Sequence, residues 1–253
     1  MTKMALYGLL LVFAVIILLL LIVSPGKSRS CPVSDTGKSI CEKSFLRIGG
    51  VRQGMFIRGA DTCNPVLLFV HGGPSFSEYF LVEKYPTGLE DYFTVCYWDQ
   101  RGGGLSISPE VTRESLNLTQ LAADMIEVTN YLRNRFGKEK IYIVAHSGGT
   151  AFAIKAVAEN PHLFSAYIGM AQVTKQAESE KRAWKYMADR YNSQGRRKMV
   201  ARLEEYPVAR GDSFILPFFN SVLRDKAMHE LGIGTMRNMK SIMTGVFYPV
   251  WLC

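Results

Sequence analysis

The spacing of hydrophobic and polar positions changes twice along this 253-residue chain. Residues 4–23 contain no charged side chain, and residues 45–174 alternate short apolar runs with segments of helical spacing. After about residue 174 the apolar positions show helical spacing alone. These changes predict three parts, which we place at residues 1–30, 31–174 and 175–253.

The segment Met4–Val23 is long enough to cross a bilayer as one helix. At ~1.5 Å rise per residue, a helix of this length spans about 30 Å, the thickness of the hydrocarbon core. A cleaved signal peptide is the alternative, but its apolar region has roughly 7–15 residues and normally ends in small residues. Here Ser24-Pro25-Gly26 follows. We expect an uncleaved N-terminal transmembrane helix, with the lipid bilayer as its partner.

The side of the membrane is poorly determined by the sequence. Lys3 lies before the apolar segment, and Lys27 and Arg29 lie after it, so the rule that positive residues stay inside hardly distinguishes the two orientations. A long downstream domain can be translocated despite its charges. We therefore expect the folded domain on the extracytoplasmic side.

Short apolar runs within residues 45–174 predict strands, because buried parallel strands read as continuous apolar segments. A hairpin is expected around Gly49-Gly50, where two strand-like segments meet a turn signal. Further strands are predicted at 66–70, 93–98, 141–145 and 166–171, and helices at 118–136 and 150–160, with Asn117 or Thr119 as a cap. This order predicts an α/β fold, a mainly parallel sheet with helices on both faces. The later helical segments predict an insertion or a second subdomain.

The formal charge of +8 does not by itself identify a partner. Many positive residues alternate with acidic ones in helical segments such as 178–190, and no nucleic-acid motif is present. We therefore expect solvated helix faces and no nucleic-acid partner. The sequence also lacks a phosphate loop, a dinucleotide fingerprint and a Cys/His cluster, so no cofactor and no metal are expected.

The cysteines allow one disulfide but do not require it. Cys96 lies inside an apolar run and is predicted to be a buried thiol. Cys31 and Cys41 flank a short polar loop and could form a bridge in an oxidising compartment.

Ser147 stands where a nucleophile could be exposed. The predicted strand 141–145 runs into His146-Ser147-Gly148-Gly149, and a helical pattern follows. A nucleophile at a tight strand-to-helix turn is strained and needs small neighbours. Ala145 and Gly149 meet that need, and the Gly148 N–H at a helix N-terminus suits a developing oxyanion. A glycine-rich turn with an incidental serine is the alternative interpretation.

A second glycine motif, His71-Gly72-Gly73-Pro74, follows the predicted strand 66–70 directly. Its glycines leave backbone N–H groups unobstructed, so the N–H groups of Gly73 and Gly148 could form an oxyanion hole with two donors. A loop that turns for packing alone is the other possibility. His71 itself is expected to bond local backbone rather than to act as a base.

The segment Asp99-Gln100-Arg101-Gly102 follows the predicted strand 93–98. Arg101 lies beside Asp99 and could brace the loops around the Ser147 turn. We interpret this segment as structural rather than catalytic.

Together, the segments 71–74, 98–106 and 145–149 resemble the α/β-hydrolase fold. The similarity is greatest to the branch of serine peptidases that includes proline iminopeptidase, and it covers about residues 45–174. In that family the strand after His-Gly-Gly-Pro ends in Asp-Gln-Arg-Gly, and the elbow is Gly-x-Ser-x-Gly-Gly. The resemblance implies Ser147 as nucleophile and the N–H groups of Gly73 and Gly148 as oxyanion donors.

The chain departs from the family pattern at two positions. Ala145 stands where the family usually has Gly, a change between small residues that the turn should tolerate. Gly148 stands where many relatives carry Trp, which could loosen the wall of the pocket.

The acid and the base of a triad are not evident. In this fold they follow the serine in the order Asp or Glu, then His. His71, His146 and His162 precede or closely follow the turn, and His229 lies in a segment that reads as a helix. Asp212 is the acidic residue with the most site-like surroundings, but its pairing with His229 is not expected.

We therefore expect the chain to be a fragment or a truncated product of a longer hydrolase. The predicted fold needs two or more strands beyond the helical cap, and the sequence shows none of them. A parallel sheet without its last strands exposes an edge and an apolar face. Poor expression or aggregation is expected when the chain is made without its anchor.

The leading interpretation is a membrane-anchored serine hydrolase of the proline-iminopeptidase type, with a small peptide as substrate. Family members bind the substrate's amine through acidic residues of the cap, where Glu204 and Glu205 lie; a solvated helix face is the alternative. An esterase or lipase-like hydrolase acting on a small ester is the second interpretation. A non-catalytic, membrane-tethered binding protein that has lost its triad is the third.

Overall fold

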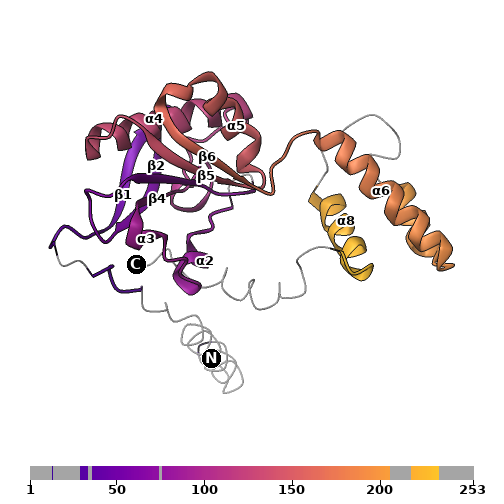
Figure 1. The fold of residues 1–253 in the computed structure, drawn as a ribbon. Helices are drawn as coiled ribbons and strands as arrows, with labels where there is room; N and C mark the ends of the chain where they lie inside the picture. Colours follow the sequence, from indigo (N-terminus) through magenta and orange to yellow (C-terminus); the bar gives the residue numbers. More distant parts are fainter. Residues whose placement is uncertain (1–12, 14–28, 34–35, 74–75, 206–217, 234–253) are drawn as a thin grey trace, which may run out of the picture. The chain divides into compact units, whose positions relative to one another are not determined.

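Six strands form one sheet in the order β1-β2-β4-β3-β5-β6 (Figure 1). Their bounds are β1 (Ile40–Ile48), β2 (Val51–Gly59), β3 (Val66–Val70), β4 (Thr94–Trp98), β5 (Ile141–His146) and β6 (Phe164–Met170). The structure, a computed structural model, describes residues 13, 29–33, 36–73, 76–205 and 218–233. Strands β4, β3, β5 and β6 are parallel to one another, and β1 and β2 are antiparallel to their neighbours. The predicted mainly parallel sheet is confirmed.

The β1–β2 hairpin turns through Gly49 and Gly50, as the sequence predicts. Ile48 pairs with Val51, so the two glycines form the whole loop, and their φ angles are 52° and 80°. Two-residue hairpins with positive φ at both positions match the twist of the strands they join, and glycine adopts that conformation at little cost.

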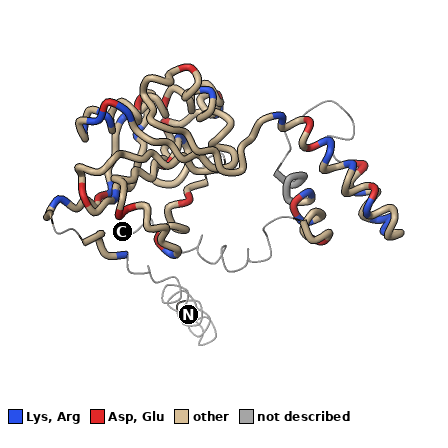
Figure 2. The backbone as a smooth tube through the Cα atoms, in the orientation of Figure 1, with Lys and Arg blue, Asp and Glu red and all other residues tan. Residues whose placement is uncertain are grey.

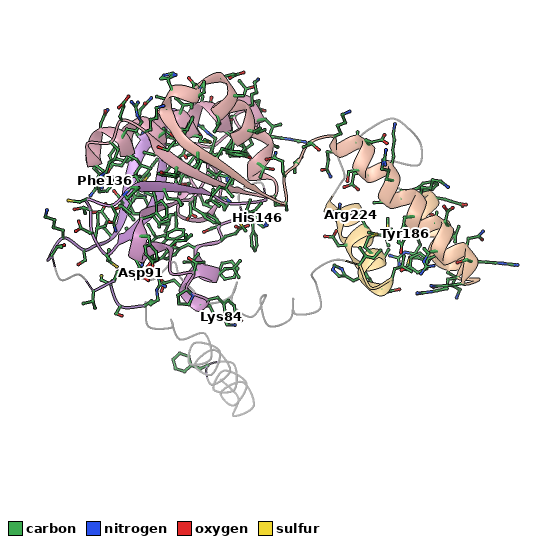
Figure 3. The ribbon with its side chains drawn as sticks, in the orientation of Figure 1. Lys84, Asp91, Phe136, His146, Tyr186 and Arg224 are labelled. Carbon is green, nitrogen blue, oxygen red and sulfur yellow. The ribbon has the colours of Figure 1, made fainter. Side chains whose placement is uncertain are left out.

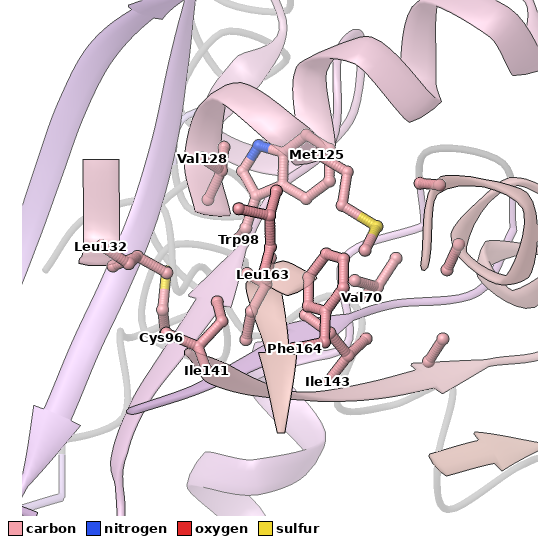
Figure 4. Close-up of a cluster of buried hydrophobic side chains, with 14 of the residues drawn as sticks. Val70, Cys96, Trp98, Met125, Val128, Leu132, Ile141, Ile143, Leu163 and Phe164 are labelled. Atoms are coloured by element: carbon pink, nitrogen blue, oxygen red, sulfur yellow. The ribbon is translucent and has the colours of Figure 1, made fainter. Parts of the chain in front are cut away.

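Helices cover both faces of the sheet because successive strand residues point to opposite sides. On one face, Leu68 and Val70 pack with residues of α4 (Leu118–Phe136) and α5 (Gly149–Glu159) in the larger hydrophobic cluster (Figure 4). On the other face, Leu67 packs with Tyr79 and Val82 of α2 (Tyr79–Lys84). The prediction of helices on both faces is confirmed.

The shorter elements complete the first part of the fold. They are α3 (Leu89–Tyr92) and the 3-10 turns η1 (Gly104–Ser106) and η2 (Pro161–Leu163). Helix α4 begins after Asn117, whose side-chain oxygen accepts a hydrogen bond from the Gln120 N–H at 2.9 Å. The cap is therefore Asn117, one of the two residues that the sequence suggested.

The chain divides into two compact units between Gln172 and Val173. The described part of the second unit is helical: α6 (Gln176–Ser193), α7 (Arg197–Glu204) and α8 (Phe218–Glu230). Met187, Tyr191 and Leu203 form its core with Met199 and Ala227. The Tyr191 hydroxyl donates to the Ala227 carbonyl at 2.8 Å, which fixes α8 against α6.

Charged residues of both signs are interspersed along α6 and α8 (Figure 2). Arg182 pairs with Glu178 and Lys185 pairs with Asp189, each four residues apart on α6. Pairs of this kind belong to exposed helix faces and contribute little stability each.

Several sequence predictions fall on residues that the structure does not describe. The predicted membrane segment 4–23 lies outside the described residues except for Phe13, and Asp212 also lies outside them. Among the described residues, no helix has both the length and the apolar character needed to cross a bilayer. The boundaries at 30/31 and 174/175 stay predictions.

The described cysteines are free thiols, and Cys96 is buried as predicted. Cys31 and Cys41 are both exposed, and their side chains share a hydrogen bond. The bridge that the sequence allowed is therefore not formed in this structure, although the two thiols lie next to each other.

Strand β6 forms one edge of the sheet. The side chains of Ile168 and Met170 are 53% and 47% exposed. Within the described part of the chain, β5 is the strand that pairs with β6.

Candidate active site

Ser147 occupies a strained turn between β5 and α5. Its φ angle is 46°, a left-handed conformation that is uncommon for residues other than glycine. The Ser147 N–H donates to the Met170 carbonyl at 2.9 Å, and the Thr150 N–H and hydroxyl donate to the Ser147 carbonyl at 3.0 and 2.6 Å. The serine is partly exposed. The turn thus has the strand-to-helix geometry that the sequence predicts for a nucleophile.

The backbone of residues 71–73 packs directly against this turn. A Cβ atom added at Gly148 would lie 2.1 Å from the Gly73 carbonyl oxygen, and one added at Gly149 would lie 2.3 Å from the His71 carbonyl oxygen. Both distances are far below a possible contact, so the approach requires glycine at positions 148 and 149. The structure therefore brings Gly73 and Gly148 together.

The N-terminus of α5 adds favourable electrostatics. Gly148 is its N-cap residue, and α5 begins at Gly149. The first N–H groups of a helix have no partner within the helix, and the helix dipole places partial positive charge there. An anionic oxygen beside Ser147 would be stabilised by these groups.

His71 is buried and both of its ring nitrogens are engaged (2% exposed). Its Nε2 accepts from the Gln100 N–H at 3.0 Å, so Nδ1 carries the proton and donates to the Gly72 carbonyl at 2.8 Å. Burial lowers the pKa of His71, in keeping with a neutral ring. His71 is structural, as the sequence analysis expected, and the Gln100 side chain fixes its carbonyl through a 2.6 Å hydrogen bond.

Asp99 is also buried, with 3% of its surface exposed, and it binds the loop that follows β4. Its carboxylate accepts from the Leu105 N–H at 2.7 Å, and it also bonds the Ser77 side chain. Burial raises the pKa of Asp99 above its ordinary value despite these bonds. These contacts are consistent with the structural interpretation of the segment.

Arg101 contacts α4 and the β1–β2 turn. Its guanidinium pairs with Asp124 of α4 through two hydrogen bonds of 2.8 and 2.9 Å and donates to the Gly49 carbonyl at 2.8 Å. The bracing of the Ser147 turn by Arg101 stays a prediction. Asp124 accepts further bonds from Gln53 and Gln120. Arg101 thus holds the β1–β2 turn to α4, and Gln100 supports the 71–73 loop at His71.

Glu78 lies at the site and was not found from the sequence. Its Oε1 accepts from the Gly72 N–H at 3.1 Å and contacts His146 Nδ1 at 2.6 Å (Figure 3 labels His146). This hydrogen bond raises the pKa of His146. Glu78 and His146 are separated by 68 positions, and no motif links them.

The described histidines of the first unit are His71, His146 and His162. The first is locked by backbone contacts, the second pairs with Glu78, and the third is exposed on η2. His229 lies on α8 in the second unit, where its carbonyl accepts from the Gly232 N–H. The geometry assigns none of them as the base for Ser147.

Glu204 and Glu205 stand at the end of α7 in the second unit, as its last residue and its C-cap residue. Both are exposed. Their proposed contact with a substrate amine stays a prediction.

Comparison with known proteins gives consistent matches. The family described as alpha/beta hydrolase fold matches residues 65–241. "Probable aminopeptidase YbaC" of Bacillus subtilis (strain 168) is 39% identical over 152 residues, which are 60% of this chain and 48% of that protein. "Proline iminopeptidase" of Thermoplasma volcanium is 27% identical over 159 residues, 61% of this chain and 52% of that protein. The chain therefore spans about half the length of these two relatives.

Among solved structures, a proline iminopeptidase-related protein of Thermus thermophilus is similar with a TM-score of 0.50 and 19% identity. The match covers 83% of this chain and 74% of that protein. At this level of identity the likeness concerns the fold alone.

Proposed function

The chain belongs to the alpha/beta hydrolase fold family, and we propose that it acts as a serine hydrolase with Ser147 as the nucleophile. The observation that carries this proposal is the left-handed conformation of Ser147, with a φ angle of 46° between β5 and α5. A strained, partly exposed serine at such a turn is the arrangement of a nucleophile elbow.

The proposed reaction forms and then hydrolyses an acyl-enzyme. Ser147 Oγ attacks the carbonyl carbon of the substrate, and the N–H groups of Gly73 and Gly148 donate to the oxyanion. The leaving group departs with a proton, and water then attacks the acyl-enzyme to release the acid. The contact between the 71–73 loop and residues 148–149 supports the two-donor oxyanion hole.

We propose a substrate with a free amino-terminal residue, so that the protein is a peptidase of the proline-iminopeptidase type. The names of two relatives, an aminopeptidase and a proline iminopeptidase, support this choice. The substrate's ammonium group needs a carboxylate partner, and Glu204 and Glu205 are the proposed candidates. A small ester is the alternative substrate, to be distinguished by experiment.

Hydrolysis assays test this proposal. The protein made from its natural gene is compared with Ser147→Ala and with Ser165→Ala, a control in which an exposed serine of β6 is replaced. Prolyl and alanyl p-nitroanilides report peptidase activity, and p-nitrophenyl butyrate reports esterase activity. We expect anilide hydrolysis that is lost in Ser147→Ala and kept in Ser165→Ala. Ester hydrolysis alone would favour the esterase, and activity in Ser147→Ala would reject Ser147.

A binding protein without catalysis is the second candidate function. The engagement of both ring nitrogens of His71 favours it, because this ring is not free to accept a proton from Ser147. If the protein from its natural gene hydrolyses neither reporter and binds an aminoacyl compound tightly, the binding role would replace the enzymatic one.

We also propose that residues 4–23 anchor the protein in a membrane. The support is the length and the uncharged character of this segment. Arg29, which follows shortly after Val23, is held to the folded unit by Glu83 and Glu90. We expect the protein to remain in the membrane fraction after extraction at alkaline pH. A protein that begins at residue 31 should appear in the supernatant or in aggregates.

A further inference from the structure

Glu78 joins two loops that meet at Ser147. Its Oε1 accepts a hydrogen bond from the Gly72 N–H at 3.1 Å, in the loop that follows β3. The same oxygen accepts from His146 Nδ1 at 2.6 Å, at the end of β5. The Glu78 side chain is only 11% exposed, so solvent competes little with either bond.

The neighbouring Ser77 extends this connection to a third strand. Its side chain bonds Asp99, which directly follows β4. Residues 77 and 78 therefore touch the carboxyl ends of β3, β4 and β5. In a parallel sheet these ends are where ligands and catalytic groups gather.

The distances around Gly72 show how closely Glu78 approaches the serine. A Cβ atom added at Gly72 would lie 3.0 Å from Glu78 Oε1, 3.1 Å from Ser147 Cβ and 3.2 Å from His146 Nδ1. Glu78, Ser147 and His146 thus all lie beside Gly72. A shift of the Glu78 carboxylate would therefore displace the loop that carries Gly72 and Gly73.

We propose that Glu78 is a positioning residue, which holds the Gly72–Gly73 segment against the Ser147 turn so that the Gly73 and Gly148 N–H groups face the same oxyanion. This inference rests on the proposed serine-hydrolase function. Glu78 acts through Gly72 and His146 and does not touch the reacting atoms.

The charge of Glu78 matters as well as its shape. A carboxylate oxygen that accepts two hydrogen bonds strengthens both, and His146 becomes the cationic partner when it is protonated. In Glu78→Gln the amide oxygen still accepts from Gly72, but the charge is lost. In Glu78→Ala both bonds are lost. We therefore expect a graded series in which the wild type is most active and Glu78→Ala is least active.

The kinetic test measures the rate at which a fluorophosphonate probe labels Ser147 in the protein made from its natural gene. We expect Glu78→Ala to lower this rate on the order of a hundredfold, the effect of displacing a group by about 1 Å, and Glu78→Gln to lower it less. In anilide assays, kcat should fall while KM stays within about twofold, because an oxyanion contact acts in the transition state.

Glu110→Gln is the matched control. Glu110 is a surface carboxylate that pairs with Arg47 at 3.3 Å, away from the serine. This variant should label at the wild-type rate. Equal rates for Glu78→Ala and Glu110→Gln would overturn the inference.

A readout that does not depend on activity tests the contact itself. The titration of His146 is followed by NMR with ¹⁵N-labelled histidine, in the wild type and in Glu78→Gln. The hydrogen bond that His146 donates to Glu78 raises the pKa of His146, and this pKa should fall towards the ordinary value in the variant. Glu78 is the charged residue that acts on His146 within the described part of the chain. An unchanged pKa of His146 in Glu78→Gln would show that Glu78 does not make this contact, and the inference would be wrong.

The outcomes separate this inference from the proposed function. If the wild type is not labelled at Ser147, both the proposed serine-hydrolase function and the positioning role of Glu78 fail. If the wild type is labelled and Glu78→Ala reacts equally fast, only the positioning role fails. If Glu78→Ala does not fold, the labelling rate of Glu78→Gln and the titration of His146 decide whether Glu78 has the positioning role.

Discussion

At the scale of single residues, the site depends on positions where a side chain would not fit. Ser147 has a strained backbone, and Gly148 and Gly149 lie so close to the 71–73 loop that any Cβ would collide with a carbonyl oxygen. Small residues around a serine, between a strand and a helix, are visible in the sequence. For this reason the strained turn at Ser147 and its glycine neighbours could be predicted from the sequence, while the catalytic roles of Ser147, Gly73 and Gly148 stay predictions.

The variant Gly148→Ala tests the contact between the loop and the turn. Its new methyl group would lie 2.1 Å from the Gly73 oxygen, so the loop must move. We expect fluorophosphonate labelling of Ser147 to slow on the order of a hundredfold, because a displacement of about 1 Å has this effect.

Gly195→Ala is the control for this experiment. Gly195 has a positive φ angle of 67°, whereas that of Gly148 is −56°, and a Cβ at Gly195 would have no neighbour within 4 Å. Its replacement costs only about 1 kcal/mol of backbone strain, and labelling should be unchanged. If Gly148→Ala were labelled as fast as Gly195→Ala, the proposed oxyanion geometry would be wrong.

Glu78 could not have been identified in the same way. It contacts His146 from 68 positions away, and it stands in a loop without a recognisable pattern. Only the sheet topology, which places β3 beside β5, brings the two residues together. Long-range pairs between single side chains are set by tertiary packing and leave no local signal.

At the scale of elements, one buried ion pair joins β4, α4 and the β1–β2 turn. The side chains of Arg101 and Asp124 are 2% and 0% exposed and share two hydrogen bonds. Gln53 links this pair to the Trp98 indole, through bonds of 2.8 and 2.9 Å. The sequence indicated no partner for Arg101, because Asp124 lies on a helix 23 positions later and only tertiary packing brings the two together.

The variant Asp124→Asn should be strongly destabilised. It leaves the Arg101 charge buried without its counter-ion, which typically costs about 3–5 kcal/mol of the free energy of unfolding. Asp189→Asn, which removes an exposed pair with Lys185, should cost no more than about 0.5 kcal/mol. Urea denaturation followed by tryptophan fluorescence gives both values, and similar losses would contradict the structural role of Asp124.

Cys31 and Cys41 connect the segment before the sheet to β1. Their thiols share a hydrogen bond and are exposed. If the domain faces an oxidising compartment, exchange with an external disulfide should link them and release two thiols. Peptide mapping without reductant should then find Cys31 linked to Cys41 and Cys63 alkylated. Alkylation of all three would contradict the extracytoplasmic placement.

At the scale of the whole molecule, the fold class was more predictable than the arrangement of its parts. Apolar runs of five or six residues predicted β3, β4 and β5 closely, because each is buried on both sides. Strand β6 was found in spite of its mostly exposed residues. The helical character of the second unit followed from its spacing, but the contacts of α6, α7 and α8 with one another did not.

The exposed edge at β6 predicts the behaviour of a protein that consists of residues 31–253. Ile168 and Met170 lie on β6, which is the edge strand of the sheet within the described part of the chain, and an unpaired edge is a template for pairing with other chains. We expect this protein to form large species that grow with concentration in analytical ultracentrifugation. The double variant Ile168→Lys with Met170→Glu should reduce them. A monodisperse wild type that melts cooperatively would contradict the prediction.

The central claim is that Ser147 is an activated nucleophile. The most direct measurement treats a whole lysate of cells that make the protein from its natural gene with a fluorophosphonate probe and identifies the modified residue by peptide mass spectrometry. We predict a phosphonate adduct on Ser147 that is lost in Ser147→Ala and retained in Ser165→Ala. The absence of any adduct on Ser147 in the protein from its natural gene would contradict the claim.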